Sequence, residues 1–563
     1  MAGIQKRANA IVSQMTLDEK LAQIGSYWIF ELQTQGELDW GKIALKLRDG
    51  IGQITRTAGA STFSPVEVAK FNNKIQKFLL EKTRMGIPAI LHEECCLGPL
   101  ALGGSVYPQM IGLASTFQPE LAKKMAEDTR KQMMAIGARQ GLGPVLDIGT
   151  DPRWGRIEET FGEDPMLVSH FGVAYIQGLQ SDDLAEGVMA TGKHFIGHSL
   201  SCGGLNCAPV HLGLREIYDT YLAPFQAVIR DAKIASVMNS YPEIDGDVVA
   251  ASPRFLKELL REELGFSGLL VSDYEAVRML NDFHFIADSH EKAAVLALKA
   301  GIEVELPTTE CYGEPLRAAL EKGEISLETV DNAVQRHLEK KLELGLFDNP
   351  YVEEGRVLEV VDSAESRTLA HEIALQSMVL LKNSGALPLN KANGTLAVIG
   401  PNANSSRNLI GDYSYPAMCN LQIFGNPDNL FFSEEKLAIS EQYKVKVPSI
   451  LDGIRSILAE DSRLIYAKGC ENAGTDVSGI PEAVTAAEAA DAVVLVLGDI
   501  SGLTPECTTG ETRDCANLRL PGVQEELAEA VLATGKPVII VLVNGRPYAI
   551  SWRTPPSARR CSR

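Results

Sequence analysis

The sequence predicts a two-domain α/β protein, with a (β/α)8-type barrel over residues 1–345 and a smaller α/β sandwich domain over residues 386–552. Three observations predict this fold class. Apolar runs of strand length alternate with amphipathic helical stretches from about residue 50 to residue 345, as in a parallel barrel. Most of these runs end in a polar or ionisable residue. A second, shorter set of strand-like runs follows a linker.

The barrel strands are predicted from short apolar runs that are rich in β-branched residues. These runs cover residues 52–55, 87–94, 143–149, 190–198, 234–241, 269–274 and 302–307. Helices are predicted between them, for example over residues 119–140 and 252–265, because their apolar positions recur at spacings of three and four.

Polar side chains stand where these predicted strands end. They are Glu93, Glu94, Asp147, Lys193, His194, Tyr241, Asp273 and Glu305. In barrels of this class the carboxyl ends of the strands carry the active site. The repeated pattern therefore predicts one common pocket, and it gives Asp273 of GLLVSDYEAV a role beyond ending a buried strand.

The second domain begins after a linker over residues 346–385, which leads through a helix into a strand. Further strands are predicted over residues 396–400, 463–469, 490–499 and 536–545, with a helix over 522–535. The last residues, 553–563, are rich in Arg and Pro and are expected to be a disordered tail or a disrupted gene end. The second domain is therefore expected to be incomplete at its C-terminus, and unfinished parallel strands expose edges and apolar faces.

Composition narrows the possible partners. The formal net charge of −20 argues against nucleic acid and anionic membranes, which require basic surfaces. The N-terminal residues have no apolar core long enough for a signal peptide, and no apolar run is long enough for a membrane span, so neither is expected. Its ten cysteines are scattered, which favours free thiols and a cytoplasmic location. We expect no metal and no cofactor.

Eight motifs occur in an order that resembles glycoside hydrolase family 3, whose two-domain members include β-glucosidases, β-xylosidases and some α-L-arabinofuranosidases. The motifs are MTLDEKLAQ (15–23), DPRWGRIEETFGEDP (151–165), GKHFIGH (192–198), VMNSYPEIDG (237–246), LREELGFSGLLVSDYEAV (260–277), KLELGLFDNPYV (341–352), SMVLLKNSGALPL (377–389) and GETRDCANLRLPGVQEEL (510–527). Together they span nearly the whole chain.

The resemblance implies two catalytic carboxyl groups, which retaining glycosidases hold roughly 5–5.5 Å apart. It makes Asp273 the nucleophile. The family's acid/base motif resembles GE-x-x-DR, which places the acid/base at Glu511 on a loop of the second domain. Cys515 departs from this motif because the family usually has Arg there, so a fixed cation near the loop is expected to be missing. Glu506 is the alternative acid/base.

The resemblance also implies the residues that bind the sugar. Arg156, Lys193 and His194 match positions that hold the sugar, and Tyr241 matches a residue that hydrogen-bonds near the nucleophile. Glu94 stands where relatives commonly have an Asp that binds outer hydroxyl groups. Because Glu is one methylene longer, it would fill the space of the hydroxymethyl group of glucose, which favours β-xylosides.

The predicted function is that of a retaining, exo-acting β-glycosidase that removes terminal β-D-xylosyl or β-D-glucosyl residues from small oligosaccharides or glycosides. One alternative is α-L-arabinofuranosidase activity. Another is a non-catalytic, unstable truncated product. A sugar-binding protein without turnover is a third. A homodimer is also possible.

Overall fold

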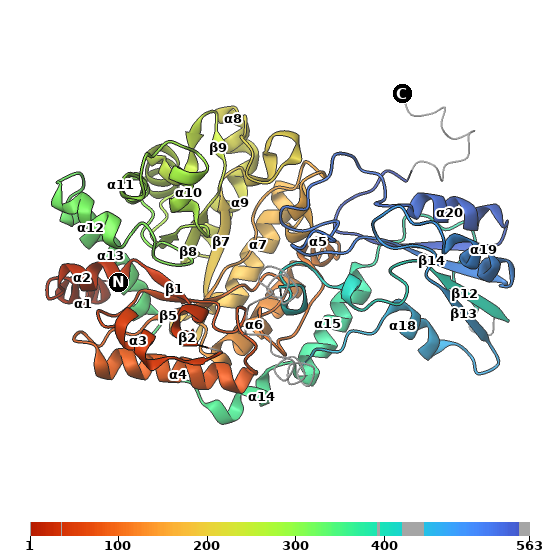
Figure 1. Cartoon of the computed structure of the whole chain (residues 1–563), viewed down its shortest axis with the longest axis horizontal. Helices are drawn as coiled ribbons and strands as arrows, with labels where there is room; N and C mark the ends of the chain where they lie inside the picture. The colour runs from red at the N-terminus through yellow and green to blue at the C-terminus, as the bar shows by residue number, and fades with distance from the viewer. Residues whose placement is uncertain (1, 35, 391–393, 419–443, 551–563) are drawn as a thin grey trace.

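The computed structural model describes residues 2–34, 36–390, 394–418 and 444–550, and it shows two α/β domains beside each other (Figure 1). The N-terminal barrel occupies one side of the molecule, and the second domain occupies the other. The predicted fold class is therefore confirmed. The expected tail over residues 553–563 lies outside the described residues. Among the described residues, no helix is both long enough and apolar enough to cross a membrane.

The barrel sheet has seven parallel strands in the order β1-β4-β5-β6-β7-β8-β11. The strands are β1 (Ser26–Trp28), β4 (Gln53–Thr55), β5 (Ile90–Glu93), β6 (Gln140–Gly141), β7 (Met189–Phe195), β8 (Ser236–Asn239) and β11 (Leu269–Val271). Neighbouring strands follow one another in the chain, as repeated β/α units require.

Residues 302–306 connect the two edges of this sheet. Val304 forms a parallel bridge with Val271 of β11. The next residue, Glu305, donates its backbone N–H to the carbonyl of Ile24, just before β1, at 2.9 Å. This segment thus takes the eighth position and the sheet curls into a barrel.

Three segments of the barrel differ from the sequence prediction. Residues 143–149 form no strand, and only Val145 bridges to Lys193 of β7, because the regular pairing falls earlier, in β6. Strand β1 was not predicted, because its three residues are too few for any alternation of apolar and polar side chains to be visible. Residues 302–307 contribute a bridge rather than a regular strand.

Helices surround the barrel sheet, and several begin at side chains that cap their first turn. Ser64 and Glu67 form a capping box at the start of α4 (Pro65–Lys82). The other longer helices of this domain are α1 (Ala2–Val12), α2 (Leu17–Gln23), α3 (Trp40–Lys46), α5 (Met110–Ala114), α6 (Pro119–Ile136), α7 (Pro165–Gln180), α9 (Ala223–Asp231), the π-helix η8 (Arg254–Glu263), α10 (Ala276–Asp282), α11 (His290–Ala300), α12 (Glu314–Glu321) and α13 (Leu327–Glu343).

Short elements complete this domain. They are the 3₁₀ helices η1 (Ile29–Leu32), η2 (Gly155–Glu159), η3 (Leu184–Glu186), η4 (His198–Leu200), η5 (Cys202–Gly204) and η7 (Val249–Ala251), α8 (Leu214–Glu216), the π-helix η6 (Ile217–Tyr221), and the two-residue strands β2 (Gln33–Thr34), β3 (Glu37–Leu38), β9 (Glu243–Ile244) and β10 (Asp247–Val248). Of these, η2 is important for function because it carries Arg156.

The second domain is built on four parallel strands in the order β13-β12-β14-β15. Alternate residues of the central strands enter two apolar cores: Ala397 and Ile399 face one, and Leu396 and Val398 face the other. A parallel sheet covered on both faces reads as continuous apolar runs, which explains why these strands were predicted correctly. The elements are β12 (Thr395–Ile399), η10 (Arg407–Leu409), α18 (Ile450–Ile457), β13 (Arg463–Ala467), α19 (Ile480–Glu488), β14 (Ala492–Gly498), α20 (Gln524–Ala533) and β15 (Val538–Val543).

The chain between the domains forms η9 (Glu354–Arg356), α14 (Val357–Val360) and α15 (Ala364–Ser377). The strand predicted to follow is not formed, although residues 378–390 are all described. Instead, Met378, Val379, Leu380 and Leu381 are between 62 and 78% exposed. At the edge of the described sheet, all six residues of β15 are only half-buried.

Candidate active site

A cavity of about 170 Å³ lies where loops of the second domain meet the barrel. All seven residues predicted for the site line it, and they come from both domains. The lining residues are Arg56, Glu94, Arg156, Lys193, His194, Met238, Tyr241, Asp273, Tyr274, Tyr413, Met418, Leu503 and Glu511. In Figure 1 the second-domain loops reach the barrel beside α5 and α7. The strand-end pattern and the second-domain loop thus converge on one place.

Asp273 follows β11 and is held by the backbone around it. Asn239 accepts its backbone N–H at 3.1 Å, and the Tyr274 N–H donates to its Oδ1 at 2.7 Å. Its other oxygen, Oδ2, is buried and has no hydrogen-bond partner among the described residues. Burial raises the pKa of Asp273 to about 7, against the opposing charges of Arg156 and Lys193, and the Glu511 charge adds to the shift. One carboxylate oxygen is therefore available to a ligand.

Glu511 enters the same cavity from the loop between β14 and α20. Arg156 Nη1 donates to its Oε1 at 2.9 Å, and the Tyr413 hydroxyl donates to its Oε2 at 2.5 Å. Its backbone N–H donates to Asp412 Oδ2 at 3.3 Å. Both carboxylate oxygens are thus oriented by charged or polar donors, and one of these donors, Arg156, belongs to the barrel.

Two buried cations, Arg56 and Lys193, line the cavity around Glu94. Arg56 Nη2 lies 2.6 Å from its Oε1, and Lys193 Nζ lies 2.8 Å from its Oε2. Burial would raise the pKa of Glu94, but Lys193 and Arg56 outweigh it and lower that pKa. Glu94 is therefore fixed as a carboxylate, in a geometry suited to accepting hydrogen bonds from sugar hydroxyl groups.

His194 is oriented from behind by Asp147. Its Nδ1 lies 2.7 Å from Asp147 Oδ2, and its Nε2 lies 3.7 Å from Asp273 Oδ2. Burial lowers the pKa of His194 well below its usual value, and Arg156, His198 and Lys193 lower it further. The ring is therefore neutral. Tyr241 donates its hydroxyl to the carbonyl of Tyr274 at 2.9 Å, which ties it to the residue after Asp273.

Three of the strand-end acids do not line the cavity, so the common-pocket prediction was too broad. Glu93 accepts the backbone N–H groups of Ala58 and Gly59. In the same way, Glu305 accepts those of residues 310–312. Asp147 acts only through His194. The alternative acid/base, Glu506, is exposed and does not line the cavity.

Sequence reasoning missed several residues of the site. Arg56 follows β4, where a polar residue after GQIT could have been noticed, but its neighbours gave no motif. Tyr413 lies in the loop after β12, and its ring faces Lys193 Nζ at 5.1 Å and the Arg156 guanidinium at 5.7 Å. Asp412 accepts from Gln109 of the barrel at 2.9 Å. No periodic signal marks loop residues of this kind.

We expect Tyr413→Phe to lower kcat/KM for an unactivated aryl glycoside by roughly 10- to 100-fold, because a hydrogen bond to a charged group contributes about 1.5–3 kcal/mol. Steady-state kinetics measure the change. The matched control is Tyr312→Phe, since the Tyr312 hydroxyl is also buried and donates to the carbonyl of Ile302 at 2.8 Å, outside the cavity. Equal losses in both variants would contradict a role for Tyr413 at Glu511.

Comparison with known proteins identifies the class to which this fold and site belong. Residues 16–339 match the Glycosyl hydrolase family 3 N terminal domain, and residues 378–559 match the Glycosyl hydrolase family 3 C-terminal domain. The chain therefore belongs to glycosyl hydrolase family 3, which confirms the resemblance drawn from its motifs.

Individual relatives are similar over most of the chain. A beta-xylosidase of Formosa agariphila is 38% identical over 83% of this chain and 64% of its own length. The periplasmic beta-glucosidase of Salmonella typhimurium is 29% identical over 96% of this chain and 68% of its own length. The solved structure of a β-glucosidase from Erythrobacter marinus superposes with a TM-score of 0.82, at 32% identity over 97% of this chain and 72% of that one. The chain thus spans about two thirds of the length of these curated relatives.

Proposed function

We propose that this protein is a retaining, exo-acting β-glycosidase whose preferred substrates are β-D-xylosides. One observation carries the proposal: Asp273 and Glu511, which come from different domains, line one small cavity together with fixed cations. The names of its relatives, beta-xylosidase and beta-glucosidase, support the same activity.

The reaction follows from the positions of these groups. The unpartnered Oδ2 of Asp273 attacks the anomeric carbon, and Glu511 donates a proton to the leaving oxygen. In the second step Glu511 removes a proton from water, which attacks the anomeric carbon and releases Asp273. Arg156, Lys193 and Glu94 orient the hydroxyl groups, and the neutral His194 ring donates or accepts a hydrogen bond without adding charge beside the nucleophile.

The preference for xylosides rests on Glu94. Arg56 and Lys193 hold its carboxylate from two sides, so it cannot rotate away to admit a larger sugar. The hydroxymethyl group of glucose would need the space that the extra methylene of Glu94 fills. Relatives from Medicago sativa are named Beta-xylosidase/alpha-L-arabinofuranosidase, so α-L-arabinofuranosides are the second candidate substrates.

We expect the wild-type protein to hydrolyse 4-nitrophenyl β-D-xyloside with a higher kcat/KM than the β-D-glucoside. We expect Glu94→Asp to raise the glucoside-to-xyloside ratio by about 10-fold or more, because one methylene in a pocket changes discrimination by roughly 10- to 200-fold. Kinetics on both substrates and on the α-L-arabinofuranoside measure this.

Glu93→Asp is the control for this substitution, because it also shortens a glutamate by one methylene but does so outside the cavity. It should leave the glucoside-to-xyloside ratio unaltered. An unchanged ratio in Glu94→Asp would remove Glu94 as the specificity residue. Folded wild-type protein that hydrolyses none of the three glycosides would overturn the proposed function itself.

We also infer a cytoplasmic location, which rests on the cysteines: every cysteine among the described residues is a free thiol, as is usual in a reducing compartment. The Salmonella typhimurium relative is named a periplasmic beta-glucosidase, so the periplasm is the alternative location. Cell fractionation would decide between them.

A further inference from the structure

Arg546, a buried arginine, hydrogen-bonds to both domains beside the acid/base loop. It follows β15 and is 1% exposed. Its guanidinium donates to the carbonyls of Pro152 and Arg153 in the barrel at 3.3 and 2.8 Å. It also donates to the carbonyls of Thr508 and Arg513, on either side of Glu511, at 3.3 and 2.6 Å. One rigid fork of donors thus spans the interface between the domains.

The loops that Arg546 connects are those that carry Glu511 and Arg156. Gly510, next to Glu511, donates its N–H to the carbonyl of Gly155, next to Arg156, at 2.9 Å. The approach is so close that a Cβ on Gly155 would meet the Gly510 oxygen at 2.0 Å. Asp514 accepts the backbone N–H groups of Gly155 and Asn206 at 2.8 and 2.7 Å. The ion pair between Arg156 and Glu511 therefore depends on this backbone contact.

Arg546 also supplies the fixed cation that was expected to be missing. The sequence has Cys515 where the family motif usually has Arg. In the structure, Arg546 Nη1 lies 2.8 Å from Cys515 Sγ, so its guanidinium occupies the neighbourhood of that thiol. Because a buried guanidinium must be hydrogen-bonded, its four carbonyl partners are fixed in turn.

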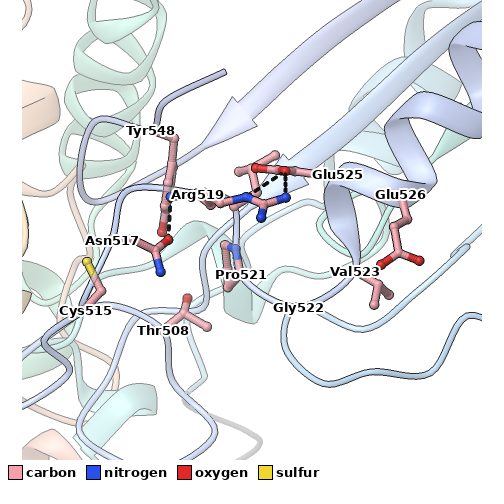
Figure 2. A pocket seen from close by; sticks show the side chains of 11 residues that line it. Thr508, Cys515, Asn517, Arg519, Pro521, Gly522, Val523, Glu525, Glu526 and Tyr548 are labelled. Atoms are coloured by element: carbon pink, nitrogen blue, oxygen red, sulfur yellow. Dashed lines mark hydrogen bonds and ion pairs between the residues drawn. The ribbon is translucent and has the colours of Figure 1, made fainter. Parts of the chain in front are cut away.

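Neither Arg546 nor Cys515 lines the sugar-sized cavity. Figure 2 shows Cys515 and Thr508 lining a different cavity, of about 420 Å³, on the second-domain side of the interface. Any effect of Arg546 on catalysis must therefore pass through the loops that it connects, those of Glu511 and Arg156.

We propose that Arg546 is a positioning residue for the acid/base: it holds the 508–515 loop on the barrel so that Glu511 meets the leaving oxygen. The inference rests on the proposed function. It predicts a particular defect. Protonation of the leaving oxygen should suffer when Arg546 is removed, whereas sugar binding and nucleophilic attack by Asp273 should not.

The test is Arg546→Met, measured with aryl β-xylosides whose leaving groups differ in acidity. We expect kcat/KM for phenyl β-xyloside to fall about 100-fold, the loss that a displacement of roughly 1 Å causes. For 2,4-dinitrophenyl β-xyloside, which needs no protonation, the fall should be under about 5-fold. Azide, which replaces the water that Glu511 activates, should restore the turnover of 2,4-dinitrophenyl β-xyloside. Arg546→Lys keeps the positive charge but loses the forked set of donors. Its kcat/KM for phenyl β-xyloside should lie between those of Arg546→Met and the wild type.

Arg139→Met is the matched control, because Arg139 also donates to main-chain carbonyls, those of Leu184, Ala185, Gly187 and Leu344, far from Glu511 in the fold. Arg139→Met should lower kcat/KM for both substrates by the same factor. The same flat loss in Arg546→Met, without azide rescue, would overturn the inference.

If Arg546→Met does not fold, as judged by circular dichroism, Asp514→Asn tests the same interface and should show the same dependence on the leaving group. A flat loss in that variant would also overturn the inference. A wild-type protein that is inactive on every glycoside is a different outcome, since it rejects the proposed function.

Discussion

We expect Asp273→Asn to lower kcat/KM for every glycoside substrate by more than about 10⁴-fold, because the amide cannot form the covalent glycosyl intermediate. The loss should be the same for phenyl and 2,4-dinitrophenyl xylosides, since both need the nucleophile. Steady-state kinetics and mass spectrometry of the trapped intermediate in the wild type measure the two sides of this prediction. Normal turnover by the variant would contradict the role of Asp273.

The raised pKa of Asp273 adds a pH signature to the same experiment. The carboxyl must be ionised to attack, so kcat/KM of the wild type should fall as the pH drops below about 7. Folding is affected in the opposite sense. Because the folded-state pKa lies above the unfolded value, the stability contribution of this group is present at low pH and is lost as the pH rises through about 7. Asp273→Asn should therefore melt higher than wild type at pH 8, with little difference at pH 4.

Glu511→Ala is expected to lower kcat/KM for phenyl β-xyloside by about 10²- to 10⁴-fold, the usual contribution of general acid catalysis. The loss should be far smaller for 2,4-dinitrophenyl β-xyloside. Azide should restore turnover of that substrate and give a β-xylosyl azide, which nuclear magnetic resonance identifies.

The control for Glu511 is Glu506→Ala, which changes an exposed carboxylate five residues earlier on the same loop. Glu506→Ala should leave kcat/KM for both substrates unchanged. A loss that depends on the leaving group in Glu506→Ala, together with none in Glu511→Ala, would transfer the acid/base role to Glu506.

The barrel and most of its site could be predicted because parallel strands bring their carboxyl ends together, whatever the loops between them do. The same rule could not distinguish Glu94 from Glu93. Successive side chains on a strand point to opposite faces, so one of these neighbours enters the cavity and the other anchors the backbone of residues 58 and 59. The periodicity alone does not say which.

The contribution of the second domain was predictable only where a motif marked it. Glu511 was found through GETRDC, whereas Tyr413 and Arg546 carry no such mark. Their partners, Glu511 at 2.5 Å and the Arg153 carbonyl at 2.8 Å, lie in other parts of the chain. The first contact depends on how two loops of the second domain pack together, and the second depends on how the two domains dock. No local pattern of apolar and polar residues encodes either arrangement.

The division of the site between two domains has a consequence for the lifetime of the catalyst. The residues that we propose to bind the sugar belong mainly to the barrel, while Glu511, the proposed proton donor, belongs to the second domain, which is joined to the barrel through a few contacts between loops. Slight loosening of that interface on heating would stop turnover while both hydrophobic cores stay intact. Thermal inactivation would then precede loss of secondary structure, and the interface, not either core, would set how long the protein stays active.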